Sequence, residues 1–194
     1  MLTDRRSFFI KEHAGILKLT DTYDILDPET KQPIGIAREE VSGLVKFMRL
    51  LINKALMPTK IVIREGDGLP PLLTIRRGVH FFRARVDVLG TDGQLIGYFK
   101  SKIFSIGGAF IVHDAADNEV ALLKGDWKGW NFKFTTKGGV ELGVVTKKWA
   151  GIGKELFTSA DNYMISLAPD APSEAAPLLL AAGLAVDIIY KERR

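Results

Sequence analysis

An almost uncharged apolar run near the C-terminus is the strongest constraint on how this chain can fold. It extends from Ala175 to Val186 and is followed by Asp187. A membrane-spanning helix needs about 20 apolar residues, and a carboxylate within hydrocarbon is costly. A helix that is apolar on all sides but too short to span is typical of a buried helix. We therefore predict a buried helix over 175–189, with Pro177 in its first turn and Ser173 as an upstream N-cap. The side chains that it should bury most deeply are Leu179, Leu180, Leu184 and Ile188.

Most of the chain before this run alternates between short apolar segments and turns, as antiparallel hairpins do. Three turns are centred at Gly93, Asn118 and Gly139 and are almost evenly spaced. Such spacing is typical of a meander in a sandwich or a barrel. A meander combined with one buried helix predicts a barrel closed around that helix. The segments that we expect to pair are 23–26 with 34–36, 61–63 with 72–75, 83–88 with 95–99, 110–112 with 120–123, and 132–134 with 140–145; 164–167 adds a further strand.

One helical pattern interrupts the strands, with apolar residues at steps of three and four over about 39–56. Pro58 should end this amphipathic helix. One interpretation is a helix packed against the sheet. The alternative is an interfacial helix that turns Lys46, Arg49 and Lys54 toward lipid headgroups.

Length and composition predict a single domain over residues 1–194 and exclude several kinds of chemistry. The chain has 46% hydrophobic and 26% charged residues, the balance of a globular protein, and it contains no cysteine. Disulfides, thiolate metal sites and a cysteine nucleophile are therefore excluded. The three histidines lie far apart and no Gly-x-Ser-x-Gly motif occurs, so we expect no enzyme. The first residues lack the apolar segment of a secretory signal, which predicts an intracellular protein.

Positive charge is concentrated between Lys124 and Lys154, where seven lysines face only Asp126 and Glu141. The lysines either form solvated strand faces or bind an anionic surface. No recognised nucleic-acid module is visible, so an anionic phospholipid membrane is the partner that we expect. A turn with two indoles, which could dip into a membrane, lies among the lysines. The candidate lipid-binding residues are Lys124, Lys128, Lys133, Lys147, Lys148, Trp127 and Trp130.

A long motif at residues 147–163 resembles the phospholipid scramblase family. It reads Lys-Lys-Trp-x-Gly-Ile-x-Lys-Glu-x-Phe-Thr-x-Ala-Asp-Asn-Tyr, and the likeness extends from about Phe8 to Tyr190. Further points of likeness are Tyr23-Asp24-Ile25, Gly97-Tyr98 and Glu141-Leu142-Gly143. The resemblance implies the tubby-like fold, a closed antiparallel barrel of twelve strands around a C-terminal hydrophobic helix. It also implies lipid translocation between the two leaflets of a membrane.

The same resemblance places a calcium-binding segment on residues 159–170, with Asp161 and Asp170 as its acidic positions. The alternate positions hold Tyr163, Ile165 and Leu167, which suits the inward face of a strand and not a calcium loop. We therefore expect no cofactor and no bound calcium. The chain also lacks the cysteine-rich, palmitoylated stretch and the Pro-rich arm of the animal scramblases.

Together these features predict a scramblase-family protein of the cytoplasm, peripheral at the membrane. We expect it to bind membrane lipid, with movement of phospholipids between leaflets as the further activity that the family implies. The alternative is a soluble interaction protein without a membrane or catalytic role. No residue pattern indicates a particular protein partner.

Overall fold

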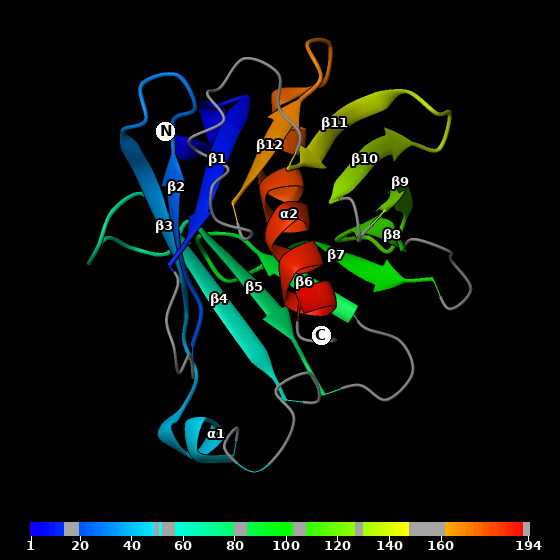
Figure 1. The fold of residues 1–194 in the computed structure, drawn as a ribbon. Coiled ribbons are helices and arrows are strands. Elements are labelled where there is room, and N and C mark those ends of the chain that lie inside the picture. Colours follow the sequence, from blue (N-terminus) through cyan, green and yellow to red (C-terminus); the bar gives the residue numbers. More distant parts are fainter. Residues whose placement is uncertain are drawn as a thin grey trace.

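The computed structural model describes residues 1–13, 20–48, 51, 57–79, 85–102, 108–126, 130–147 and 162–191. Its core is a closed antiparallel barrel of twelve strands with the C-terminal helix α2 inside it (Figure 1). The strands follow one another around the barrel in chain order, and β1 closes it by pairing with β12. The strands are β1 (Ser7–Glu12), β2 (Thr22–Leu26), β3 (Pro33–Glu39), β4 (Thr59–Arg64), β5 (Leu73–Arg77), β6 (Arg85–Leu89), β7 (Leu95–Ser101), β8 (Ala109–Asp114), β9 (Glu119–Asp126), β10 (Asn131–Thr136), β11 (Glu141–Thr146) and β12 (Tyr163–Leu167).

The predicted strand pairings are confirmed for the described residues, while residues 83–84 of one predicted segment lie outside them. The paired strands are β2 with β3, β4 with β5, β6 with β7, β8 with β9, and β10 with β11. Gly93 and Gly139 adopt positive φ angles of 76° and 84°, which suits glycine at the turns where they were expected. The strand that the sequence analysis did not identify is β1, which lies between β12 and β2.

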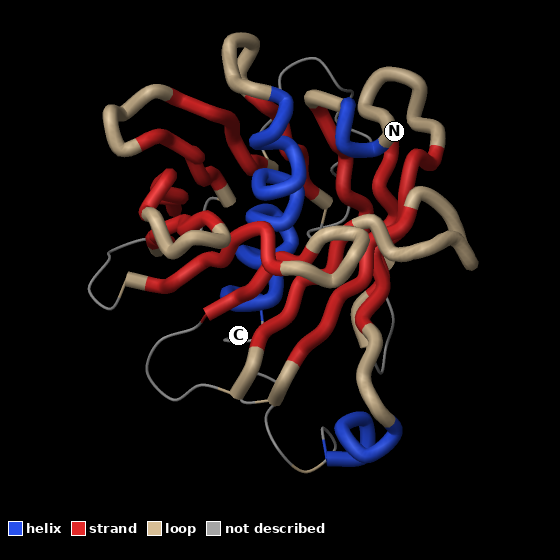
Figure 2. The backbone as a smooth tube through the Cα atoms, turned by 180° about the vertical axis from the view of Figure 1, so that it is seen from behind, coloured by secondary structure: helices blue, strands red, loops and turns tan. Residues whose placement is uncertain are grey.

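Helix α2 (Ala176–Lys191) fills the barrel, as the view from behind also shows (Figure 2). Leu179, Leu180, Leu184 and Ile188 are each at most 2% exposed, so the predicted buried helix is confirmed. Its N-terminal side differs from the prediction in one detail. Ser173 is the first residue of a short 3-10 helix, η4 (Ser173–Ala175), and the N-cap of this helix is Pro172. No side-chain hydrogen bond caps η4. Extended backbone at Pro172 starts the turn in place of a serine cap.

Two glycines allow α2 to approach the barrel wall closely. A Cβ atom at Gly143 on β11 would lie 2.5 Å from Leu179 Cδ2 and 2.4 Å from the backbone oxygen of Ser166. A Cβ atom at Gly183 on α2 would lie 2.4 Å from Ile165 Cδ1. Any larger side chain would push the helix away from β11 and β12.

Polar contacts inside the barrel hold the C-terminal half of α2. The hydroxyl of Tyr23 donates a 2.5 Å hydrogen bond to Asp187 Oδ2. Burial, and next the charge of Asp187, raise the pKa of Tyr23 well above its usual value, so the phenol keeps its proton and remains a donor. The carboxylate that would be costly in lipid therefore has a donor within the protein.

Arg77 binds the end of the same helix. Its guanidinium donates to the backbone oxygen of Ile188 at 3.2 Å, to the backbone oxygen of Met57 at 3.1 Å, and to Thr59 Oγ1 at 3.1 Å. A cation at the C-terminal end of a helix is favourable because the last carbonyl groups carry partial negative charge. Arg77 thus joins β4, β5 and α2 at one end of the barrel.

The amphipathic helix predicted over 39–56 is shorter in the described residues. Glu39 belongs to β3, because it continues the ladder opposite Ile61 of β4, and α1 (Gly43–Met48) begins four residues later. Helix α1 buries none of its residues and projects from the barrel (Figure 1), so the described part of the predicted helix does not pack against the sheet. Residues 49–50 and 52–56 lie outside the described residues.

Candidate anion-binding site at one end of the barrel

Antiparallel strands alternate in direction, so successive connections lie at opposite ends of the barrel. The strand ends joined from β1 to β2, β3 to β4, β5 to β6, β7 to β8, β9 to β10 and β11 to β12 lie at one end of the barrel, together with α1 and the C-terminal end of α2. We call this the α1 end. The other connections, including the tight turns at Gly93 and Gly139, lie at the opposite end, which we call the hairpin end.

The hairpin end is acidic. Among the described residues of its connections, the N-terminal segment and the three adjoining residues of each strand, exposed and half-buried carboxylates number eleven and cations five. Asp24 and Asp87, the middle residues of five-residue strands, are counted at the other end. The carboxylates are Asp4, Glu29, Glu65, Asp67, Asp92, Asp114, Asp117, Glu119, Glu141, Asp170 and Glu174. The cations are Arg5, Arg6, Lys31, Arg64 and Lys137.

The α1 end has the opposite charge. By the same definition, its described residues include eleven exposed or half-buried cations and four such carboxylates. The cations are Lys11, Arg38, Lys46, Lys60, Arg76, Arg85, Lys100, Lys102, Lys124, Lys133 and Lys147. The carboxylates are Asp24, Glu40, Asp87 and Asp126, while Glu12, Asp21 and Glu39 are buried. The charge of the described residues is therefore strongly polarised along the barrel.

A pocket of about 460 Å³ lies at the α1 end, between the start of α1 and strands β4 to β6. Its apolar wall comes from Val41, Val45 and Pro58. Lys60 and Arg76 are directly opposed in the β4–β5 ladder and place two cations on its polar wall. The pocket therefore combines two cationic side chains with an apolar surface.

The carboxylates in this pocket are neutralised by cations. Glu40 accepts hydrogen bonds from Arg64 at 2.7 Å and from Lys60 at 3.1 Å, and these bonds, Arg64 first, lower the pKa of Glu40. Asp87 is paired with Arg85 at 2.7 Å. Arg76 is exposed, and its side chain has no polar partner among the described residues. The guanidinium of Arg76 is therefore available for an anion.

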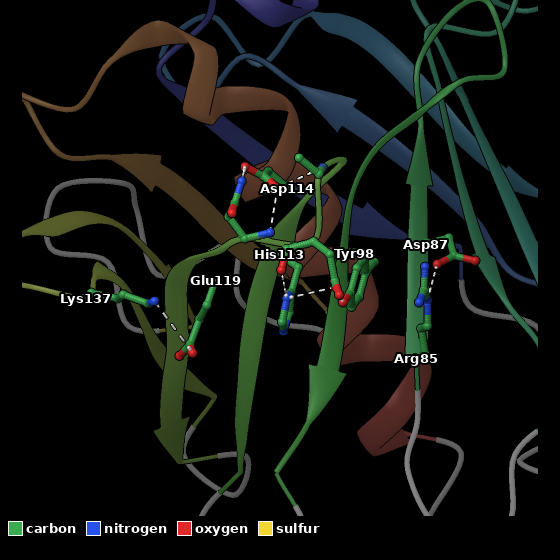
Figure 3. A network of polar contacts seen from close by, with 10 residues as sticks. Arg85, Asp87, Tyr98, His113, Asp114, Glu119 and Lys137 are labelled. Carbon is green, nitrogen blue, oxygen red and sulfur yellow. Dashed lines mark hydrogen bonds and ion pairs between the residues drawn. The ribbon is translucent and has the colours of Figure 1, made fainter.

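The neighbouring outer face of β6 to β9 carries a network of polar contacts around Arg85 and Tyr98 (Figure 3). Besides the Arg85–Asp87 pair, the Arg85 guanidinium lies 3.8 Å from the ring centroid of Tyr98, and His113 stacks on the same ring at 4.5 Å. Tyr98 donates a hydrogen bond to Asp117. This network fixes Arg85 on the strand face, and the free cation of the pocket remains Arg76 among the described residues.

Two of the predicted lipid-binding lysines are neighbours. Lys124 and Lys133 are opposed in the β9–β10 ladder, and both are exposed on the outside of the barrel. Lys133 also pairs with Glu141 at 3.0 Å across the adjoining strand, so part of its charge is compensated. These lysines add to the positive charge of the α1 end but line no part of the pocket.

Trp130 is placed differently from the prediction that it dips into a membrane. It is 7% exposed and stacks on Tyr163 with a centroid separation of 5.2 Å. Lys147 Nζ lies 4.4 Å from its ring centroid, and the Lys147 N–H donates to its backbone oxygen. The indole is thus part of the core and is not available to insert into lipid.

The remaining predicted site residues lie in several different parts of the chain. Lys128, Lys148, Trp127 and Asp161 lie outside the described residues. Asp170 is exposed in the turn after β12, at the acidic hairpin end. Tyr163, Ile165 and Leu167 belong to the core cluster, so the strand predicted for this part of the calcium segment is confirmed. Within the described parts of the chain, no group of three or more histidine, aspartate or glutamate residues is arranged to hold a metal ion.

The fold defines a helix-filled, twelve-stranded barrel with one basic end. A family model named Scramblase matches residues 20–193, and the chain belongs to that family. Comparison with curated proteins and with solved structures gave no match. Among the described residues, no helix is long and apolar enough to cross a membrane.

Sequence reasoning missed Lys60 and Arg76. The signal was present, because both occupy outward positions of strands whose alternate residues are apolar. Lysine density along the sequence points to residues 124–154. Lys60 and Arg76 lie outside that stretch and become neighbours only when β4 pairs with β5.

Proposed function

We propose that this scramblase-family protein binds anionic phospholipids at a membrane surface through the α1 end of its barrel. The observation that carries the proposal is the separation of charge between the two ends. Each Lys or Arg near an anionic bilayer contributes about 1 kcal/mol to attraction, and carboxylates contribute repulsion. A dipolar protein of this kind is drawn to the bilayer with its basic end first.

The pocket beside α1 supplies a specific contact for a headgroup within this basic end. Arg76 can donate two parallel hydrogen bonds to a phosphate, and Lys60 lies across the ladder from it. The apolar wall of Val41, Val45 and Pro58 suits the glycerol and upper acyl region of the lipid. Movement of phospholipids between leaflets would be a further activity. We propose binding as the primary one, because α2 and buried side chains fill the barrel.

Flotation with liposomes tests the proposal. We expect the wild-type protein to float with vesicles that contain anionic phospholipid and to remain at the bottom with neutral vesicles. High salt should weaken binding strongly, because the screening length falls from about 10 Å at 0.1 M to about 3 Å at 1 M. Arg76→Glu should weaken binding about thirtyfold at low salt, since reversing one contact charge removes about 2 kcal/mol.

Lys137→Glu is the matched control, because it changes the net charge equally but lies at the hairpin end. Its binding should remain within about threefold of wild type. Lys124→Glu with Lys133→Glu tests the lysine pair outside the pocket. Equal flotation with neutral and anionic vesicles, or with neither, would contradict the proposal and favour the soluble interaction protein.

A further inference from the structure

We propose that α1 inserts apolar side chains into the bilayer and so supplies a second, charge-independent membrane contact. This inference rests on the proposed function and specifies how the α1 end meets the lipid. The observation behind it is the exposure of Leu44, Phe47 and Leu51, which are 70%, 61% and 76% exposed.

Leu44 and Phe47 lie three residues apart in α1, and residues three apart share a face of a helix. Leu51 follows in a turn, where its N–H donates to the backbone oxygen of Met48 at the end of α1. Exposed apolar residues that occur singly are normal on protein surfaces, whereas a cluster marks an interaction site. Val79, which follows β5 at the same end, is 59% exposed and extends the apolar surface of the α1 end. The other large exposed apolar residues described lie at the hairpin end, each on a different segment: Met1, Leu69, Val120 and Val140.

The two sides of α1 have different surroundings. Val45 faces the pocket with Lys60 and Arg76, whereas Leu44 and Phe47 are exposed to solvent. Figures 1 and 2 show α1 at the end of the molecule, away from the body of the barrel. The projecting helix therefore carries exposed apolar side chains, while Lys60 and Arg76 lie on strands of the barrel.

This order of layers fits a lipid leaflet better than a protein surface. In a leaflet, anionic phosphates lie above the acyl chains, so a protein that approaches from water meets charge first and hydrocarbon second. Apolar side chains that project beyond a ring of cations can reach the acyl region while Lys46, Lys60 and Arg76 remain at phosphate depth. A single electrostatic contact gives weak binding, and stable attachment needs a second signal.

The test replaces both exposed side chains and measures binding to anionic vesicles over a range of salt. Leu44→Ser with Phe47→Ser leaves the charge unchanged and removes no buried side chain, so its melting curve should match that of wild type. Binding should fall at least about tenfold, because each buried Leu or Phe side chain is worth a factor of about ten. The part of wild-type binding that persists at high salt should disappear.

Val120→Ser with Val140→Ser is the matched control, because it removes two exposed apolar side chains near the hairpin end. This control should bind as wild type does. Wild-type binding to vesicles with no loss in the Leu44/Phe47 variant would overturn the insertion of α1 while leaving the proposed function intact. Absence of any wild-type binding would overturn both. If the wild type sediments as a dimer and the variant as a monomer, the apolar face belongs to a second copy and the inference is wrong.

Discussion

Replacing Leu180 with aspartate should prevent the protein from folding. Leu180 lies in the N-terminal half of α2, inside the barrel, and is 1% exposed. An unpaired carboxylate at this position would cost several kcal/mol, a large part of the roughly 5–15 kcal/mol that stabilises a typical domain. Expression in the insoluble fraction, or loss of the cooperative melting transition, is the result to measure.

Two further variants make this prediction decisive. Leu180→Ala should remain folded but lose about 2–5 kcal/mol of unfolding free energy in urea titration, as deletions of buried leucines do. Leu69→Asp introduces the same charge at a leucine that is 50% exposed, and should change stability little. A soluble Leu180→Asp protein with a wild-type melting curve would show that α2 does not form the core.

The second large effect is expected at Arg77. Arg77→Met should lower the unfolding free energy by about 3–5 kcal/mol, because it removes a buried cation and leaves the backbone oxygens of Met57 and Ile188 without this donor. Arg76→Met is the matched control, because it makes the same substitution at the adjacent residue of β5, which lies on the outer face of the strand. We expect its stability to lie within about 0.5 kcal/mol of wild type. Equal loss in both variants would mean that Arg77 does not anchor the end of α2.

Much of the fold could be predicted from the sequence because each element carries a local signal. The hairpins are marked by alternating residues and by turn glycines, and the buried helix by an apolar run that ends near Asp187. The strand β1 was not identified, since its partner β12 lies near the other end of the chain and its partner β2 does not follow it directly in the sequence. The closure of the barrel was expected, but its closing strand was not named.

The membrane-facing residues were harder to predict because they depend on tertiary placement. Trp130 has the sequence context of an exposed turn, yet it stacks on Tyr163, more than thirty residues further along the chain. The helix after β3 is periodic enough to suggest packing on the sheet, whereas α1 leaves Leu44 and Phe47 in solvent. The charge separation is a property of the topology, since it appears only when alternate connections are assigned to opposite ends.

The charge separation also revises the role expected of the lysines at 124–154. Lys124 and Lys133 lie near the α1 end and contribute to its positive potential. Lys137 lies at the hairpin end, 4.0 Å from Glu119, and should contribute nothing to membrane binding. Position along the barrel therefore matters more than lysine density along the sequence.

The orientation of the bound protein tests the central claim most directly. The chain has no cysteine, so a single introduced thiol can carry a fluorescent dye at one chosen position. Val79→Cys and Val140→Cys are well matched, being 59% and 64% exposed at opposite ends of the barrel. The measurement is quenching of the dye by nitroxide-labelled headgroups in anionic vesicles. We expect strong quenching at residue 79 and little at residue 140; equal quenching at both, or stronger quenching at residue 140, would contradict binding through the α1 end.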